Sequence, residues 1–469
     1  MKLIRILFII TSATIFAACT KDGLYDGQKK DETVGYLVSV TDSIAFNSAD
    51  SFNEYIGGTL LDLGAEVSGK AVAALFNDAK ILKLIKKMNQ EQGNHDFRFE
   101  KFNFTYNSKD NAGKDIVLSG CVIFPNTPSG NIKHELDGVT LFHPYWLNVK
   151  KCATIVGSPI MSRAAYNQAV VIPDFQGYGL TEENFHHPFL EYGVLARQSI
   201  DCELAALELL ENHGLALKED YITYNMGMSK GAPVAMRTLE MVQNTEPESI
   251  RRKLNIKSTY CCTGPYDPMG LLEAFNSEGT GTNCWMGVML ISSAYYAYPD
   301  KFQGYAIEDF FTEDFNNARF NDGVREYNIV DLVESRLTGE APLNELFTAY
   351  GLTSVRRILS PSFFNDNGSF NYDNELFSIL TGILKSNNTA TGWDPVTTVL
   401  VEHSTDDDFV NYDVSMKAFE DLKSLEHGGD NENVHQNTYR LFDHNTMSGL
   451  SIVRMILMED PAESKKTDL

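Results

Sequence analysis

Apolar and polar positions divide the chain into helical and strand-forming stretches. Between residues 50 and 92 apolar residues recur at roughly helical spacing, which predicts an N-terminal helical layer over residues 36–96. From residue 97 to residue 125 the pattern changes to alternation on both sides of a polar turn, which is typical of a β-hairpin.

Five later apolar runs have the length of buried parallel strands, and they cover residues 138–142, 169–173, 221–226, 256–262 and 397–401. Helical periodicity follows the second run, and another helix is predicted to start at Ser229, after the third. Strands that alternate with helices indicate an α/β fold with a mostly parallel, doubly wound sheet. Residues 266–394 are too many for a simple βα connection, so we expect an ordered insertion there.

The composition is that of a globular protein, and its net charge argues against a nucleic-acid partner. Hydrophobic residues make up 43% of the chain, and 39 Lys and Arg stand against 63 Asp and Glu, for a formal charge of -24. This charge repels phosphate backbones, so we expect no nucleic-acid partner. The cysteines lack metal-ligand spacing, and neither a metal nor another cofactor is predicted. The pairing of the six cysteines after Cys19 and the oligomeric state stay open.

The N-terminus has the features of a signal peptide over residues 1–18, with cationic residues before an apolar stretch that is too short to span a bilayer. Small residues then precede Cys19, which resembles the lipobox of bacterial lipoproteins. This resemblance implies acylation of Cys19, a tether over residues 19–35 and a lipid anchor in the cell envelope, on the periplasmic side or the outer-membrane surface. A plain secretory signal with an incidental Cys19 is the alternative.

A Gly-x-Ser-x-Gly segment centred on Ser229 carries the main chemical signal. It joins an apolar strand to a helix, with Gly227 and Gly231 flanking the serine. A serine on so sharp a turn takes a strained backbone conformation, and the glycines remove Cβ atoms that would collide. The segment predicts an exposed, nucleophilic Ser229, whereas a simple tight turn is the alternative.

A nucleophilic serine needs a base, and the base needs a carboxylate that holds its tautomer. Residues 403–410 follow a predicted strand and resemble the His-Ser/Gly-x-x-Asp-x-x-Val segment of many α/β hydrolases. The resemblance implies that Asp407 is the acid, although Asn411 replaces the usual proline. Asp406 and Asp408 are the alternatives.

The predicted base is His444. In α/β hydrolases the chain order is serine, acid and then histidine, and His444 follows a strand-like run over residues 437–442. The distance from Asp407 to His444 leaves room for one helix, near residues 413–425, and for that strand. His427 and His435 lie in a polar stretch and have the character of loop histidines.

Further segments resemble the bacterial members of the secretory-lipase-like group of α/β hydrolases, namely residues 170–179, 187–189, 264–267 and 393–395. The resemblance covers roughly residues 97–460. It implies an α/β-hydrolase fold whose core comprises residues 97–265 and 395–469, with residues 266–394 as a helical cap over the active site.

The tetrahedral intermediate of such an enzyme needs preorganised hydrogen-bond donors for its oxyanion. The backbone N–H of Lys230, next after the nucleophile, is one candidate. Tyr145 is another, because residues 142–146 resemble the family's His-Gly-x loop, with Pro144 in place of glycine. Asp174 matches an aspartate assigned to the oxyanion hole in fungal lipases of the group, although a turn-capping role is equally open.

Three functions fit these observations. The leading hypothesis is a serine hydrolase that cleaves small-molecule carboxylic esters through an acyl-enzyme at Ser229. A serine peptidase of the prolyl-oligopeptidase type shares the triad, but the residues before the core cannot form that family's β-propeller. A non-catalytic surface lipoprotein that retains the fold is the third.

Overall fold

The computed structural model describes residues 35–46, 51–52, 55, 98–126, 135–145, 152–183, 186–277, 283–321, 325–335, 340–424 and 430–457. The predicted signal peptide, Cys19 and the tether up to residue 34 lie outside these ranges, as does most of the predicted helical layer. Among the described residues, no helix combines the length and the apolar character that crossing a membrane requires.

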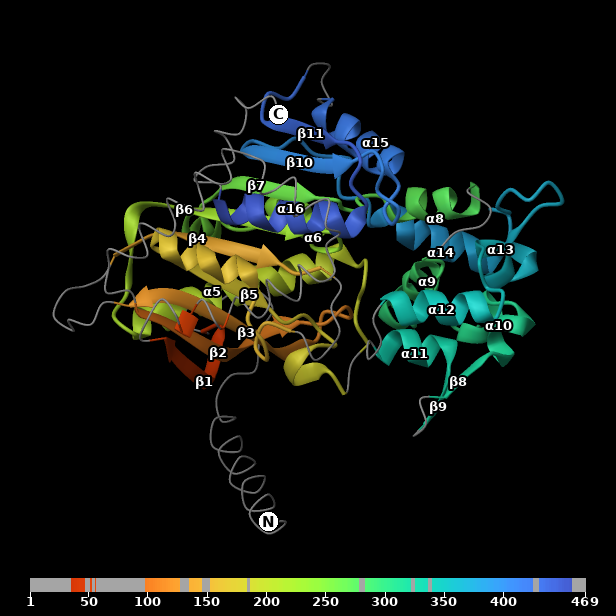
Figure 1. The fold of residues 1–469 in the computed structure, drawn as a ribbon, viewed down its shortest axis with the longest axis horizontal. Helices are drawn as coiled ribbons and strands as arrows, with labels where there is room; N and C mark the ends of the chain where they lie inside the picture. The colour runs from red at the N-terminus through yellow and green to blue at the C-terminus, as the bar shows by residue number, and fades with distance from the viewer. Residues whose placement is uncertain are drawn as a thin grey trace, which may run out of the picture. The chain divides into compact units, whose positions relative to one another are not determined.

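A nine-stranded sheet forms the centre of the fold, in the order β1-β2-β3-β5-β4-β6-β7-β10-β11 (Figure 1). The strands from β1 to β3 pair antiparallel, and β3 also runs antiparallel to β5. From β5 to β11 every pair is parallel, which confirms the predicted α/β class. The strands are β1 (Leu37–Phe46), β2 (Arg98–Lys109), β3 (Asp115–Asn126), β4 (Glu135–His143), β5 (Gln168–Pro173), β6 (Ala216–Met228), β7 (Ile256–Cys262), β10 (Thr398–Ser404) and β11 (Val434–Tyr439).

Helices cover both faces of this sheet, so its central strands are apolar on both sides. Tyr260 and Cys262 of β7 pack in the cluster that contains α16, whereas Cys261 packs with α6 and α15 on the opposite face. The six cysteines after Cys19 are all buried, and none of them forms a disulfide in the described part of the chain. The core helices are η2 (Pro159–Tyr166), η3 (Gly179–Thr181), α5 (Tyr192–Asn212), α6 (Gly231–Asn244), α7 (Glu248–Leu254), α15 (Tyr412–Lys423) and α16 (His444–Leu457).

Two edge strands differ from the sequence prediction. Residues 37–46, assigned above to a helical layer, form β1, which pairs antiparallel with β2. The predicted run at residues 437–442 is instead β11, which begins at Val434 because that residue lies opposite Val399 of β10. β1 is exposed along most of its length and β11 is mostly half-buried, so their sequences show little of the alternation that marks a strand with one buried face.

The segment between β7 and β10 is mainly helical and lies beside the end of the sheet toward which β4 and β10 point (Figure 1). Its aromatic residues pack with one another and with core residues such as Phe175 and Tyr178 in one hydrophobic cluster. Its elements are α8 (Pro268–Ser277), α9 (Trp285–Ala297), η4 (Ile307–Phe310), α10 (Glu313–Asn317), β8 (Arg319–Asn321), β9 (Glu326–Asn328), α11 (Ile329–Ser335), α12 (Glu340–Ala349), α13 (Val355–Ile358), η5 (Pro361–Phe363) and α14 (Glu375–Ser386).

Candidate active site

The candidate residues collect at one edge of the sheet. Tyr145, Asp174, Ser229 and Asp407 follow the carboxyl ends of β4, β5, β6 and β10, in that order, and these strands are parallel. His444 is the first residue of α16. Loops at the carboxyl edge of a parallel sheet are where α/β proteins bind their ligands, so the placement suits a functional site.

The turn around Ser229 has the strained geometry that the sequence predicts. Ser229 adopts a φ of 50°, which is unusual for a residue with a Cβ atom. Its N–H donates to the Cys262 carbonyl at 2.8 Å, which fixes the turn to the end of β7. A Cβ atom at Gly227 would collide with the backbone of Gly231, and one at Gly231 would collide with the His143 carbonyl. Both glycines of the motif are therefore required for the turn.

Ser229, His444 and Asp407 form one hydrogen-bonded chain. The Ser229 Oγ lies 3.0 Å from Nε2 of His444, and Nδ1 of His444 lies 2.9 Å from Oδ2 of Asp407. The Asp407 side chain has no exposed area, and Ser229 is 9% exposed. With Nδ1–H donating to the carboxylate, Nε2 can accept the serine proton, which is the arrangement that activates a serine nucleophile.

The structure separates the three consecutive aspartates. Asp406 accepts the Leu441 N–H at 2.7 Å, and Asp408 accepts the backbone N–H of His444 at 3.1 Å. Of the three, Asp407 alone is hydrogen-bonded to the His444 ring in the described part of the chain. Burial by itself would raise the pKa of Asp407, but His444 and His403 together hold it well below its usual range. Asp407 is therefore a carboxylate at neutral pH.

The two alternative histidines do not join this group. His435 lies on β11, in a strand where the sequence indicated a loop, and pairs with Leu400. His427 lies outside the described residues.

Sequence reasoning missed two neighbours of the triad. His403 is fully buried at the end of β10, and its Nε2 lies 3.2 Å from Oδ2 of Asp407. The Phe409 ring stacks on His444 with 4.8 Å between ring centroids and also meets Trp285 of α9 at 5.6 Å. The first position of the His-Ser/Gly-x-x-Asp segment was a signal for His403, whereas nothing in the sequence pointed to Phe409.

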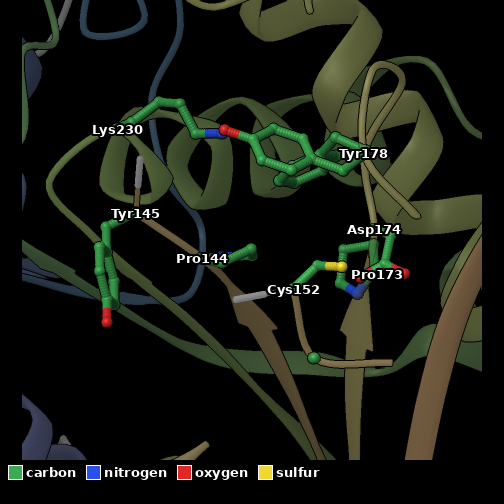
Figure 2. Close-up of a pocket in the computed structure, with 9 residues that line it drawn as sticks. Pro144, Tyr145, Cys152, Pro173, Asp174, Tyr178 and Lys230 are labelled. Carbon is green, nitrogen blue, oxygen red and sulfur yellow. The ribbon is translucent and has the colours of Figure 1, made fainter. Parts of the chain in front are cut away.

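The three oxyanion candidates line one small pocket (Figure 2). Lys230, Tyr145 and Asp174 contribute to its wall, and its remaining residues come from the same three segments and from the segment before β5. No described residue of the insertion between β7 and β10 lines this pocket. Among the described residues, the lining consists of Pro144, Tyr145, Cys152, Ala153, Pro173, Asp174, Phe175, Tyr178 and Lys230.

The Lys230 side chain is held inside the protein. It is 2% exposed, and its Nζ donates to Nε2 of His187 at 2.9 Å. His187 in turn donates from Nδ1 to the Gln176 carbonyl at 2.8 Å, so its Nε2 is an acceptor. The ammonium also lies over the Phe175 ring, and Figure 2 shows it pointing toward the Tyr178 hydroxyl. These contacts fix Lys230, the residue directly before α6, and therefore its backbone N–H.

Asp174 is a buried carboxyl group whose two oxygens have different surroundings. Oδ2 accepts hydrogen bonds from Ser119 and Thr154, whereas Oδ1 is buried and has no hydrogen-bond partner among the described residues. Burial raises the pKa of Asp174 to about 6, against the lowering effect of these hydroxyls and of Lys101. The protonated form of Asp174, which can donate a hydrogen bond, is therefore accessible closer to neutral pH than for an exposed aspartate.

Comparison with solved structures finds chains of the same overall arrangement. The rice cell wall degrading esterase LipA from Xanthomonas oryzae matches with a TM-score of 0.60 at 16% sequence identity, over 92% of this chain and 99% of that chain. Candida antarctica lipase A in its closed state matches with a TM-score of 0.52 at 13% identity, over 79% of each chain. Neither the comparison with family models nor that with curated protein sequences gives a match. The sheet order, the strained turn at Ser229 and these structural matches show that the chain has the α/β-hydrolase fold.

Proposed function

We propose that the protein hydrolyses carboxylic esters of small molecules through an acyl-enzyme at Ser229. The observation that carries this proposal is the continuous hydrogen-bonded chain from the Ser229 hydroxyl through His444 to the buried Asp407 carboxylate. The proposal requires that the strained turn at Ser229 presents the hydroxyl to substrate, as nucleophile turns of this fold do.

In the first half of the reaction, Ser229 attacks the acyl carbonyl while Nε2 of His444 takes its proton. The resulting imidazolium then protonates the departing alkoxide, so the alcohol leaves and the acyl group stays on Ser229. Asp407 holds the Nδ1–H tautomer and stabilises the imidazolium. In the second half, His444 takes a proton from a water molecule, which attacks the acyl carbonyl. The bond to the Ser229 Oγ then breaks, His444 returns the proton to Oγ, and the carboxylic acid leaves.

The negative charge that forms on the carbonyl oxygen needs donors at the pocket. The backbone N–H groups of Lys230 and Tyr145 are the first two, because both residues line the pocket beside the nucleophile turn. A protonated Asp174 supplies a third, through the buried Oδ1 for which the described residues offer no partner. A water-excluded donor of this kind stabilises charge more strongly than it would in bulk solvent.

The structural matches support an ester substrate. LipA is described as a rice cell wall degrading esterase and the Candida protein as a lipase, and each shares the fold over most of this chain. The pocket lined by Lys230, Tyr145 and Asp174 is narrow, so we propose short acyl groups as the first substrates to test.

An activity screen with matched chromogenic substrates tests the proposal. We expect p-nitrophenyl esters of short acids to be hydrolysed and peptide p-nitroanilides to be spared, with turnover lost in Ser229→Ala. Hydrolysis of the anilides with comparable kcat/KM would favour the peptidase. No turnover of any substrate, together with no Ser229-dependent covalent labelling, would favour a non-catalytic protein.

We also propose that the protein is attached to the cell envelope by lipid on Cys19. The support is the sequence of the first 19 residues alone, where small residues precede the cysteine. A tether up to residue 35 would then leave the described part of the chain outside the bilayer, on the periplasmic side or on the outer-membrane surface.

A further inference from the structure

Asp407 lies between two histidines, of which the proposed reaction uses one. His444 contacts it from α16, and His403 contacts it from the end of β10. The His403 side chain has no exposed area, and its Nε2 lies 3.2 Å from Oδ2 of Asp407 and 3.0 Å from the Val410 carbonyl oxygen. A buried histidine in direct contact with the proposed catalytic carboxylate calls for a physical role.

The surroundings of the His403 ring determine where its hydrogen lies. Nε2 faces two oxygen atoms that can only accept, so the hydrogen is on Nε2. Nδ1 is buried and has no hydrogen-bond partner among the described residues. The Tyr412 ring packs edge-on against His403, with centroids 5.8 Å apart, and restrains the plane of the imidazole. His403 therefore presents one N–H in a fixed direction.

The Nε2–H of His403 contacts two parts of the turn that carries Asp407, namely the Asp407 side chain and the Val410 backbone carbonyl. Oδ1 of Asp407 accepts the backbone N–H groups of Phe409 and Val410 at 2.9 and 2.8 Å, so the turn wraps around its own carboxylate. His403 binds the Val410 carbonyl on the far side of this turn and places the positive end of its N–H dipole against Oδ2. Rotation of the Asp407 carboxylate away from His444 would break the contact at Oδ2.

We propose that His403 is a positioning residue, which fixes the Asp407 carboxylate in the orientation that His444 needs and moderates its basicity. The inference rests on the proposed function, since it assigns a role within the same triad. Without the His403 N–H, the carboxylate would be less restrained and would hold the imidazolium proton of His444 more tightly.

Other charged groups around the triad bear on any pH effect. On the acid's own loop, Asp408 binds the backbone N–H of His444, and Asp406 binds the Leu441 N–H. Asp443 precedes His444 and accepts the Thr446 N–H. The Cys262 thiol on β7 is also near Asp407, and burial raises its pKa well above the ordinary value, so it stays uncharged. All of these residues are still present in a variant in which only His403 is replaced.

The test compares His403→Leu with His403→Gln, because a glutamine amide nitrogen can occupy about the position of Nε2 and keep a donor there. We expect His403→Leu to lower kcat for a short p-nitrophenyl ester by about tenfold or more, with KM within about threefold of wild type. We also expect the ascending limb of its kcat/KM pH profile to move to higher pH by about half a unit or more. His403→Gln should restore most of kcat and the wild-type limb.

The matched control is His435→Leu, the same substitution on the neighbouring strand, where the residue pairs with Leu400. It should leave kcat and the pH profile near wild type. If His403→Leu does not fold, His403→Asn replaces it, since the shorter amide cannot reach Asp407 and should behave as the leucine variant.

Wild-type kcat and pH profile in His403→Leu or His403→Asn would overturn the inference, as would equal losses in the donor-keeping and donor-lacking variants. The proposed function fails separately, through a wild-type protein without Ser229-dependent ester hydrolysis.

Discussion

At the scale of single residues, the chemistry is expected to depend on one carboxylate among three neighbouring aspartates. We predict that Asp407→Asn lowers kcat for a p-nitrophenyl ester by about 10^4-fold, because the amide cannot hold the Nδ1–H tautomer of His444. Asp406→Asn and Asp408→Asn should retain far more activity, since their carboxylates bind backbone N–H groups. Equal losses in all three variants, measured under the same conditions, would show that the acid is assigned wrongly.

A second residue-scale prediction concerns Glu203, a buried acid on α5 that the proposed reaction does not use. Thr223 donates to its Oε1 at 2.9 Å, and burial raises its pKa to about 8 despite this bond. Its folded pKa is thus higher than its unfolded one, so its contribution to stability is present below about pH 4.5 and is lost as pH rises through about 8.

Glu203→Gln removes this ionisation. We expect the variant to melt a few degrees above wild type near pH 8.5, with a gain that shrinks as pH falls toward about 5, measured by thermal unfolding at both values. A difference in Tm that does not vary with pH would mean that Glu203 does not titrate in this range.

The sequence was enough to bring Ser229, Asp407 and His444 into consideration, because each stands at a chain position that the fold imposes. Gly227 and Gly231 carried the strongest signal, since only residues without Cβ fit the turn there. Phe409 was missed because its role comes from ring contacts with His444 and with Trp285 on α9, which spacing along the chain does not encode. His403 occupies the first position of the recognised segment, but its contacts with Asp407 and the Val410 carbonyl became visible only in the structure.

At the scale of elements, the insertion reaches the triad through the loop after β10. Trp285 of α9 packs on Phe409, which stacks on His444, and Asn283 donates to the Asp408 carbonyl at 3.3 Å. These contacts connect the insertion to His444, the proposed base, although the described residues that line the pocket of Figure 2 belong to the core.

We predict that trimming or exchanging residues 266–394 shifts kcat/KM between short and long acyl esters by about tenfold or more, which corresponds to about 1.4 kcal/mol of differential transition-state binding. The measurement is a series of p-nitrophenyl esters of rising chain length, with labelling by a small phosphonate as the control for an intact Ser229. A folded variant with the parent's chain-length profile would place substrate choice in the pocket around Lys230 and Asp174.

The sequence predicted the strands that are buried on both faces of the sheet. It did not predict the edge strands β1 and β11 correctly. β5 is buried along its whole length, and its apolar run was visible in the sequence. β11 carries Gln436 and Asn437, which its edge position tolerates, so pairing with β10 rather than apolar content sets its limits. β1 is mostly exposed and owes its conformation to β2, a partner far away in the chain.

At the scale of the whole molecule, the proposed lipid anchor on Cys19 attaches the protein to the membrane and takes no part in catalysis. We predict that Cys19→Ala releases the protein from membranes while kcat stays unchanged, because acyl chains contribute about 0.8 kcal/mol per buried CH₂ and the polar tether has no comparable affinity. Fractionation of cells that express each form measures this. Continued membrane association of the variant would mean that a different attachment exists.

The central claim is that Ser229 is the nucleophile, and its most direct test is covalent labelling with a fluorophosphonate followed by peptide mapping. We expect one adduct, on the peptide that contains Ser229, and neither adduct nor ester turnover in a folded Ser229→Ala variant, a loss of about 10^4-fold or more in kcat. Labelling of a different serine, or ester hydrolysis by Ser229→Ala at a rate near that of wild type, would contradict the claim.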